Sequence, residues 1–207
     1  MIVKRLATDR SGATAAEFGL VLPLLLILLF GIIDAGRWMW TYNQAEKATQ
    51  MGARFAVVGN AVTPALYSSY LTVGGLTQGD PIPASAFGVI RCTGSGSGTT
   101  ISATCTCPTS PCPSGFTTTT AAAFKNIVNR MQLFLPLLTA SNVEIDYSSS
   151  GLGYAGSPVL PDLSPLVTVK ITGMTFRPLT ILAMTSVPMP SFTTTLSAED
   201  LSGSVSN

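Results

Sequence analysis

An uninterrupted apolar run lies near the N-terminus of the chain. Residues 18–33 read FGLVLPLLLILLFGII and contain no charged side chain. As an α-helix this run is about 24 Å long, whereas the hydrocarbon core of a bilayer requires about 20 residues, or roughly 30 Å. A membrane span must therefore include either residues 13–16, which places Glu17 inside the membrane, or residues 34–39 at the other end.

The residues on either side of this run predict its orientation. Residues 1–12 carry three basic side chains and one acidic side chain, and Trp38 and Trp40 follow the run as an interfacial aromatic belt would. The excess of basic residues predicts a cytoplasmic N-terminus and a periplasmic C-terminal part. Removal as a secretory signal peptide is not favoured, because that would require an apolar core of about 7–15 residues followed by small residues. We therefore expect a single-pass inner-membrane protein.

The helix is predicted to continue beyond the membrane as far as Val58. No proline occurs in residues 35–58, and Gly59 and Pro64 mark the end. Small and aromatic residues recur along one face at spacings of three and four, and these are Trp38, Tyr42, Ala45, Ala48, Gly52 and Phe55. Residues 13–58 would then form one helix of about 69 Å.

Two features inside this helix have structural consequences. Asp34 and Arg37 are three residues apart and are expected to form an ion pair on one helix face. Pro23 lacks the backbone N–H and is expected to kink the helix, which membrane helices tolerate.

The pattern after residue 58 predicts an α+β fold, with a second helix packed on an antiparallel sheet. The second helix is expected at residues 120–138, with Thr120 as its cap, Pro136 at its end, and an apolar face formed by Phe124, Ile127, Val128, Met131, Leu133, Phe134 and Leu135. Strands are expected at residues 87–92, 142–147, 166–174 and 192–196. Short helices or loops are expected at residues 65–71 and 176–184. The domain organisation is thus a basic leader at 1–12, a transmembrane and stem helix at 13–58, and a periplasmic domain at 59–207.

All four cysteines fall in a segment rich in Thr, Ser, Gly and Pro, which is expected to be a loop at residues 92–120. They are Cys92, Cys105, Cys107 and Cys112. Zinc sites prefer two C-x2-4-C pairs, and only part of that pattern is present. In an oxidising compartment the four cysteines predict two disulfides, with three possible connectivities.

Composition and charge limit the chemistry. Hydrophobic residues make up 46% and charged residues only 10%, against about 25% charged residues in a typical soluble domain. Lys and Arg total 11 against 10 for Asp and Glu, so no basic excess indicates nucleic acid as a partner. The sequence has no histidine, which excludes Ser-His-Asp and Cys-His catalysis and any metal site with a His ligand.

No motif indicates an enzyme. Residues 151–156 match G-x-G-x-x-G, but Pro158 and Pro161 follow, so no helix N-terminus is expected there to bind phosphate. Asp146, Asp162 and Asp200 are expected to be isolated acids in turns or at strand edges. We therefore expect no catalytic residue, no metal, no cofactor and no small-molecule substrate.

The N-terminal region resembles a known family of pilus proteins. Gly12, followed by ATAAEF with Glu17 and Phe18 at its end, is similar to the processing site of type IV prepilins. Residues 10–37 and 50–58 together resemble the TadE/TadG-like family. The members of this family are minor pilins or pseudopilins of the tight-adherence (Flp) pilus. The resemblance implies that a prepilin peptidase cuts between Gly12 and Ala13. It also implies that the new amine of Ala13 pairs with Glu17 of a neighbouring subunit, with other pilins or assembly proteins as partners.

Two alternatives remain open. Glu17 could instead extend to the cytoplasmic headgroups at the start of the helix, where its charge also suits the helix dipole. The chain could then be a permanently anchored periplasmic interaction module that is not processed and does not enter a filament. If the chain is instead a processed pilin, as the resemblance implies, the mature protein becomes associated with the pilus or extracellular.

Overall fold

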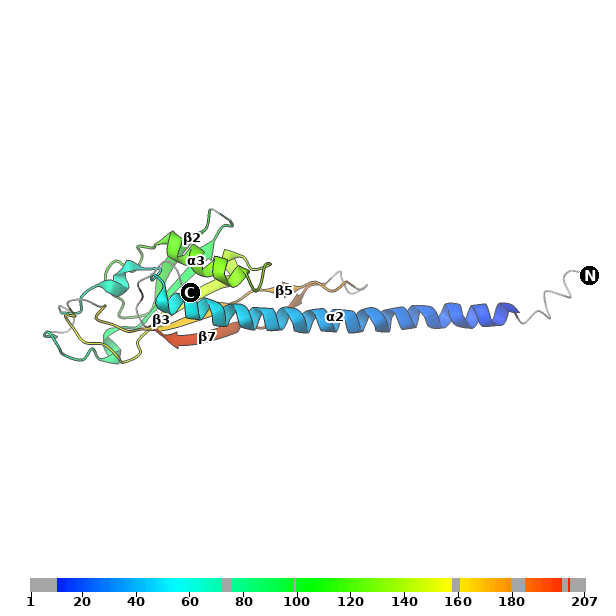
Figure 1. The fold of residues 1–207 in the computed structure, drawn as a ribbon, viewed down its shortest axis with the longest axis horizontal. Helices are drawn as coiled ribbons and strands as arrows, with labels where there is room; N and C mark the ends of the chain where they lie inside the picture. Colours follow the sequence, from blue (N-terminus) through cyan, green and yellow to red (C-terminus); the bar gives the residue numbers. More distant parts are fainter. Residues whose placement is uncertain are drawn as a thin grey trace, which may run out of the picture. The chain divides into compact units, whose positions relative to one another are not determined.

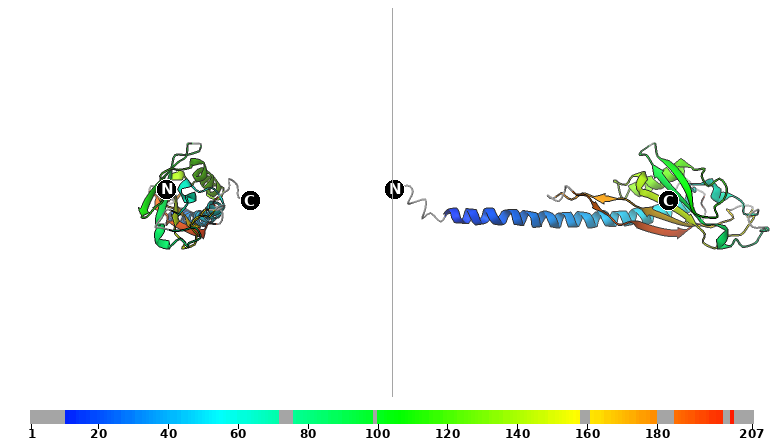
Figure 2. Two further views of the ribbon diagram at one scale, coloured as in Figure 1. Left: turned by 90° about the vertical axis from the view of Figure 1, so that its left-hand side faces the viewer. Right: turned by 180° about the vertical axis from the view of Figure 1, so that it is seen from behind.

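A single long helix forms the N-terminal part of the described chain. The computed structural model describes residues 11–71, 76–98, 100–157, 161–179, 185–198 and 201. Helix α2 (Ser11–Val58) runs for 48 residues and confirms the predicted continuous helix (Figure 1). Pro23 lies inside α2, which continues through it as an α-helix, and the expected kink stays a prediction (Figure 2).

The chain divides into two compact units. The first comprises Met1–Thr41 and Thr175–Pro188, and the second comprises Tyr42–Met174 and Met189–Asn207. The predicted basic leader lies, up to residue 10, outside the described residues, as does Asp200.

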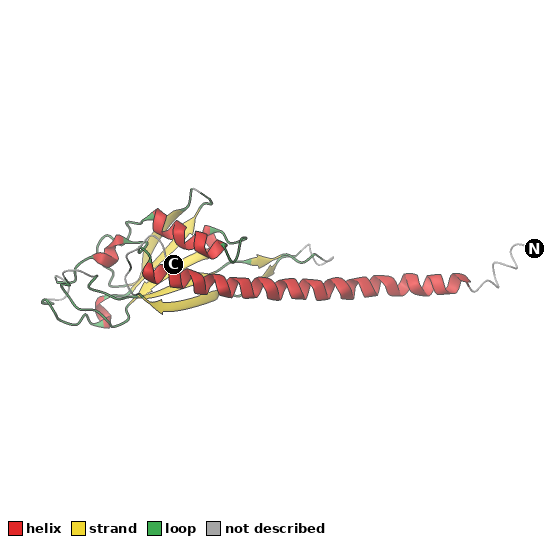
Figure 3. Ribbon diagram, in the orientation of Figure 1, coloured by secondary structure: helices red, strands yellow, loops and turns green. Residues whose placement is uncertain are grey.

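The second unit contains a five-stranded antiparallel sheet. Its strands are β1 (Val89–Ser95), β2 (Ser102–Thr109), β3 (Val143–Ser148), β4 (Leu166–Ile171) and β7 (Phe192–Ser197). The spatial order is β2-β1-β3-β4-β7, and each neighbouring pair is antiparallel. In the centre of the sheet Ile145 lies opposite Cys92 on one side and Val169 on the other. Together with the helices, this sheet confirms the α+β class (Figure 3).

Two helices cover one face of the sheet and bury its apolar positions. They are the C-terminal part of α2 and helix α3 (Ala121–Gln132). Gly52 marks the point of closest approach, because a Cβ atom there would lie 2.7 Å from the Met131 side chain and 3.4 Å from Val169. Ala45, Ala48 and Phe55 are also buried, so the stripe predicted on the stem is confirmed in this unit.

Helix α3 is shorter than expected. It ends at Gln132, not Leu138, and Thr120 occupies the cap position without a side-chain hydrogen bond. Leu133 was assigned to the apolar face but is 70% exposed. The chain leaves the helix four residues before Pro136, and the Gln132 side-chain amide donates a hydrogen bond to the Leu138 carbonyl across the turn, at 2.8 Å.

The other elements agree with the sequence to different degrees. Strands β3 and β7 lie within a residue of their expected bounds, whereas β1 starts two residues later than expected and β4 ends three residues earlier. Short 3-10 helices occur at η1 (Pro64–Tyr67), η2 (Ala84–Ala86) and η3 (Ala140–Asn142).

Two segments that were not expected to form strands contain them. The cysteine segment at 92–120 was expected to be a loop, but most of its first half belongs to the β1–β2 hairpin. The segment expected as a helix or loop at 176–184 instead begins in the first unit as strand β5 (Thr175–Phe176), which pairs with β6 (Val187–Pro188). Its residues 180–184 lie outside the described part of the chain.

Candidate membrane anchor and assembly segment

The N-terminal part of α2 exposes an unusually large apolar surface. Among the described residues, α2 contains one stretch that is long and apolar enough to cross a membrane. Its large apolar side chains are exposed to between 37% and 72%, and they include Phe18, Leu20, Leu22, Leu25, Leu28 and Ile32. Monomeric soluble proteins rarely leave a continuous apolar patch of this kind uncovered. This surface therefore needs a bilayer or partner helices to cover it, as expected for a single-pass membrane anchor.

The four residues predicted for processing and subunit packing lie in the first turns of α2. Gly12, Glu17 and Phe18 are exposed, and Ala13 lies in the helix beside Gly12. Ala13 and Glu17 are four residues apart, so they share one face of the helix. Glu17 forms no ion pair with another residue in the described part of the chain. These four positions therefore lie in the first turns of α2, next to the apolar run.

At the other end of the apolar run, Asp34 connects the helix to the β5–β6 hairpin. Both carboxylate oxygens accept hydrogen bonds from the Leu179 backbone N–H, at 2.8 Å and 3.0 Å. Arg37 donates to Asp34 at 3.2 Å, which confirms the predicted ion pair. The Arg37 guanidinium also lies 5.4 Å from the centroid of the Phe176 ring, within the range of a cation–π contact. Asp34 itself is 8% exposed, so this carboxylate is enclosed by its partners.

The link to Leu179 could not be found from the sequence. The Asp34–Arg37 spacing is a local signal, but Leu179 is 145 residues away along the chain. The hydrogen bond uses a backbone N–H, so no side-chain type at position 179 indicates it. The signal that the sequence does offer is Asp34 itself, because a carboxylate beside an apolar run must accept hydrogen bonds from other groups of the protein.

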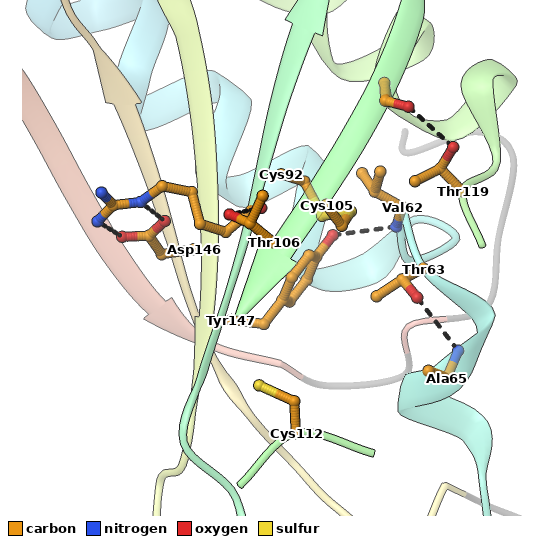
Figure 4. Close-up of a disulfide and its surroundings, with 12 residues drawn as sticks. Val62, Thr63, Ala65, Cys92, Cys105, Thr106, Cys112, Thr119, Asp146 and Tyr147 are labelled. Atoms are coloured by element: carbon orange, nitrogen blue, oxygen red, sulfur yellow. Dashed lines mark hydrogen bonds and ion pairs between the residues drawn. A yellow bond between two sulfur atoms is a disulfide. The ribbon is translucent and has the colours of Figure 1, made fainter. Parts of the chain in front are cut away.

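Two disulfides brace the β1–β2 hairpin and the turn that follows. Cys92 and Cys105 lie directly opposite each other in the strand register and are bonded (Figure 4). They are almost fully buried, at 0% and 3% exposure. Cys107 bonds to Cys112 within a five-residue separation. Of the three possible connectivities, the structure therefore has the one that joins neighbours along the chain.

A buried tyrosine lies beside the first disulfide. The Tyr147 hydroxyl oxygen accepts a hydrogen bond from the Val62 backbone N–H at 3.1 Å, which ties β3 to the chain just after the stem helix (Figure 4). Complete burial raises the pKa of this phenol far above its usual value. Tyr147 is therefore a neutral structural residue at any physiological pH.

Four charged residues form a network on the sheet face that the helices leave open. Arg91 contacts Glu144 and Asp146 at 2.8 Å and 2.9 Å, and Lys170 contacts the same two acids at 3.2 Å and 2.6 Å. Burial alone would raise the pKa of Asp146, but hydrogen bonds from Arg91 and Lys170 outweigh it and lower the pKa. The expectation that Asp146 is isolated is wrong, because cross-strand register brings residues from β1, β3 and β4 together.

Asp162 is also not isolated. Its carboxylate accepts hydrogen bonds from the backbone N–H groups of Gly156, Ser157 and Tyr70, at 2.9, 2.7 and 2.7 Å, and from the Ser69 hydroxyl at 3.2 Å. Burial would raise its pKa, but these donors lower it. The G-x-G-x-x-G segment thus directs its last glycine N–H to an acid of the chain itself, which leaves that donor engaged by the fold.

The described residues contain no group of three or more His, Cys, Asp or Glu side chains that is arranged to hold a metal ion. The acids that come together are instead neutralised by Arg91 and Lys170 or by backbone donors. The arrangement stabilises the sheet and its loops.

Comparison with known proteins gives one finding for the anchor. Residues 12–54 match the family described as TadE-like protein, which confirms the resemblance over this part of the chain. The match begins at Gly12 and includes Glu17, the Asp34–Arg37 pair and most of the stem. No curated protein and no solved structure matches the chain.

Proposed function

Because the chain is TadE-like over residues 12–54, we propose that it is a minor pilin, pseudopilin or assembly component of a tight-adherence pilus. It would act by helix packing and scaffolding, without catalysis. Its anchor would cross the inner membrane once, with the N-terminus in the cytoplasm and the disulfide-braced domain in the periplasm.

The observation that carries this proposal is the continuity of α2. The helix presents an uncovered apolar surface over its first half, and residues of its second half, such as Ala48 and Phe55, belong to the core of the folded domain. A subunit built in this way can be inserted in a bilayer and then packed side by side with other such helices, since the same apolar surface suits both environments.

Processing would adapt the helix end for assembly. Cleavage between Gly12 and Ala13 would remove three basic side chains and one acidic side chain, and it would create an amine at Ala13. That amine and Glu17 of a neighbouring subunit would neutralise each other at a helix–helix interface, where an unpaired charge is costly. The loss of the basic leader would also weaken the charge that holds this end in the cytoplasm.

The first experiment is the intact mass of the membrane-extracted protein, expressed with and without a prepilin peptidase. The proposal expects a chain that begins at Ala13 only when the peptidase is present. A chain that begins at Met1 in both cases would support the alternative, a permanently anchored periplasmic interaction module.

Substitution of Glu17 tests the packing step. Glu17→Ala is expected to leave membrane insertion intact and to abolish recovery of the protein in sheared pili. Glu46→Ala is the matched control, because Glu46 is an exposed acid on the stem of the same helix. Normal incorporation of Glu17→Ala would refute the role of Glu17, and crosslinks to membrane partners with no protein in sheared pili would favour the alternative.

A further inference from the structure

An apolar groove lies between α2 and the β5–β6 hairpin. Its volume is about 650 Å³, within the range of about 300–1,000 Å³ that is typical of small-molecule sites. Its walls are formed on the helix side by Gly31, Ala35 and Met39 and on the hairpin side by Phe176, Pro178 and Val187. The Asp34 carboxylate also borders the groove, but its oxygens are engaged by Leu179 and Arg37, so the groove presents mainly carbon atoms.

The position of the groove along α2 indicates whether it faces lipid or water. It begins at Gly31, inside the charge-free run, and ends at Met39, just before the exposed Trp40. If the run crosses a bilayer, the groove lies where the span ends on the domain side, at the depth preferred by interfacial tryptophans. The hydrogen bonds of Asp34 to Leu179 hold the hairpin at this level of the helix.

We propose that this groove binds an acyl chain of a phospholipid from the surrounding membrane, with an anionic headgroup beside Arg177. The proposal rests on the membrane anchoring proposed above. Water is a poor occupant for a groove with this lining, whereas the acyl chains of a bilayer would lie directly beside it.

Charge supports the choice of an anionic headgroup. Arg37 is already paired with Asp34, and the side chain of Arg177, next to Phe176, is exposed. Arg177 forms no ion pair with another residue in the part of the chain that the structure describes. A guanidinium at this position suits a lipid phosphate, which it contacts with paired donors.

The chain supplies its own reporters for a test. It has two tryptophans, of which Trp38 lines the groove and Trp40 is 68% exposed on a different helix face. Trp40→Phe therefore leaves a reporter in the groove, and Trp38→Phe leaves a reporter for bulk lipid. The full-length protein would be reconstituted in vesicles of phosphatidylcholine and phosphatidylglycerol whose acyl chains carry bromine, which quenches tryptophan fluorescence on contact.

The groove is then filled by substitution. Ala35→Phe in the Trp40→Phe background is expected to reduce the bromine quenching of Trp38 by roughly twofold or more, because a ligand in such a site has most of its surface in contact with the walls. Gly36→Phe adds the same bulk outside the groove lining and is the matched control, since nothing lies within 4 Å of a Cβ at that position. With Arg177 present, brominated phosphatidylglycerol is expected to quench Trp38 more than brominated phosphatidylcholine does. Arg177→Gln is expected to remove this difference.

The outcomes separate the two proposals. Quenching of Trp40 without quenching of Trp38 would overturn the lipid site while supporting membrane anchoring. Equal loss of quenching in Ala35→Phe and Gly36→Phe, or no loss in either, would also overturn it. Absence of quenching at both tryptophans would refute the membrane placement on which the proposal rests. Retention of both disulfides and unchanged Trp40 quenching in the Trp38→Phe background would show that Ala35→Phe still folds.

Discussion

The two disulfides are expected to differ in their contribution to stability, and the structure gives the order. Cys92–Cys105 closes a sequence separation of 13 residues, and Cys107–Cys112 closes one of 5. The chain-entropy relation gives about 2.9 kcal/mol for the first bridge and about 2.1 kcal/mol for the second at 25 °C. The difference of about 0.8 kcal/mol comes from loop length alone.

Packing increases this difference. Cys92 and Cys105 are buried between the sheet and its helices, whereas Cys107 and Cys112 are half-buried. Removal of the buried sulfurs leaves space in a packed core, which adds a cost beyond the loss of the crosslink. The paired substitution Cys92→Ala/Cys105→Ala should therefore destabilise the domain by at least about 3 kcal/mol, and Cys107→Ala/Cys112→Ala by about 2 kcal/mol.

The measurement is urea-dependent pulse proteolysis of the full-length protein in detergent micelles, with each pair substituted to alanine so that no free thiol remains. Wild-type protein treated with reductant provides a control in which both bridges are lost without a change of side chain. Equal midpoints for the two double variants, or a larger loss for the Cys107–Cys112 pair, would refute the reasoning from loop length and burial.

Three further predictions follow from the contacts. Gly94→Ala should destabilise the domain by about 2 kcal/mol in the same assay, because a Cβ there would lie 2.2 Å from the Phe124 ring, and unchanged stability would contradict this packing. Asp146 has a lower pKa in the folded protein than in the unfolded chain, where the usual value is about 3.9. Its negative charge therefore stabilises the fold above about pH 3.9, and this contribution is lost as the pH falls through the lower pKa of the folded state. Asp146→Asn should therefore remove part of the acid sensitivity of the urea midpoint below about pH 4, and an unchanged pH profile would contradict it. Asp34→Ala should accelerate limited proteolysis of the β5–β6 hairpin, because the Leu179 N–H loses its acceptor, whereas rates equal to wild type would show that Asp34 does not hold the hairpin.

The elements with a strong periodic pattern were predictable from the sequence. The length and hydrophobicity of residues 18–33 indicated the anchor, and the spacing of small residues such as Ala45, Ala48 and Gly52 indicated the buried face of the stem. Alternation of apolar and polar residues located β3 and β4. These signals are local, so they do not depend on knowing which segments meet in the fold.

Strand β2 and the last three residues of β1 were missed because the composition of this segment resembles a loop. Strand β2 is rich in Thr and Ser and contains Pro108, and among its inward residues only Cys105 is fully buried. The fold accepts this strand because it lies at the edge of the sheet and is bonded to β1 through Cys92. Strand propensity depends on such context more than helix propensity does.

The charged network was missed for a different reason. Arg91, Asp146 and Lys170 come from three strands, and their side chains meet only when the register of those strands is known. A shift of one residue in either pairing would turn one of these side chains to the buried face. Single residues in a sequence carry no information about such a register.

The contacts of Asp34 also bear on which end of α2 completes the membrane span. Glu17 has no ion-pair partner among the described residues, whereas Asp34 is enclosed by the Leu179 N–H and by Arg37. Because a satisfied carboxylate costs less to place in a low-dielectric region than an unpaired one, we expect the span to extend past Asp34 and to leave Glu17 near the cytoplasmic headgroups before assembly. If the chain is processed as proposed, the Gly12–Ala13 bond would in that register lie at the membrane surface, within reach of a peptidase, and Glu17 would enter the apolar region only when a neighbouring amine is available. Attachment of a membrane-impermeant label to Ala15→Cys from the cytoplasmic side would support this order of events, and complete protection before processing would contradict it.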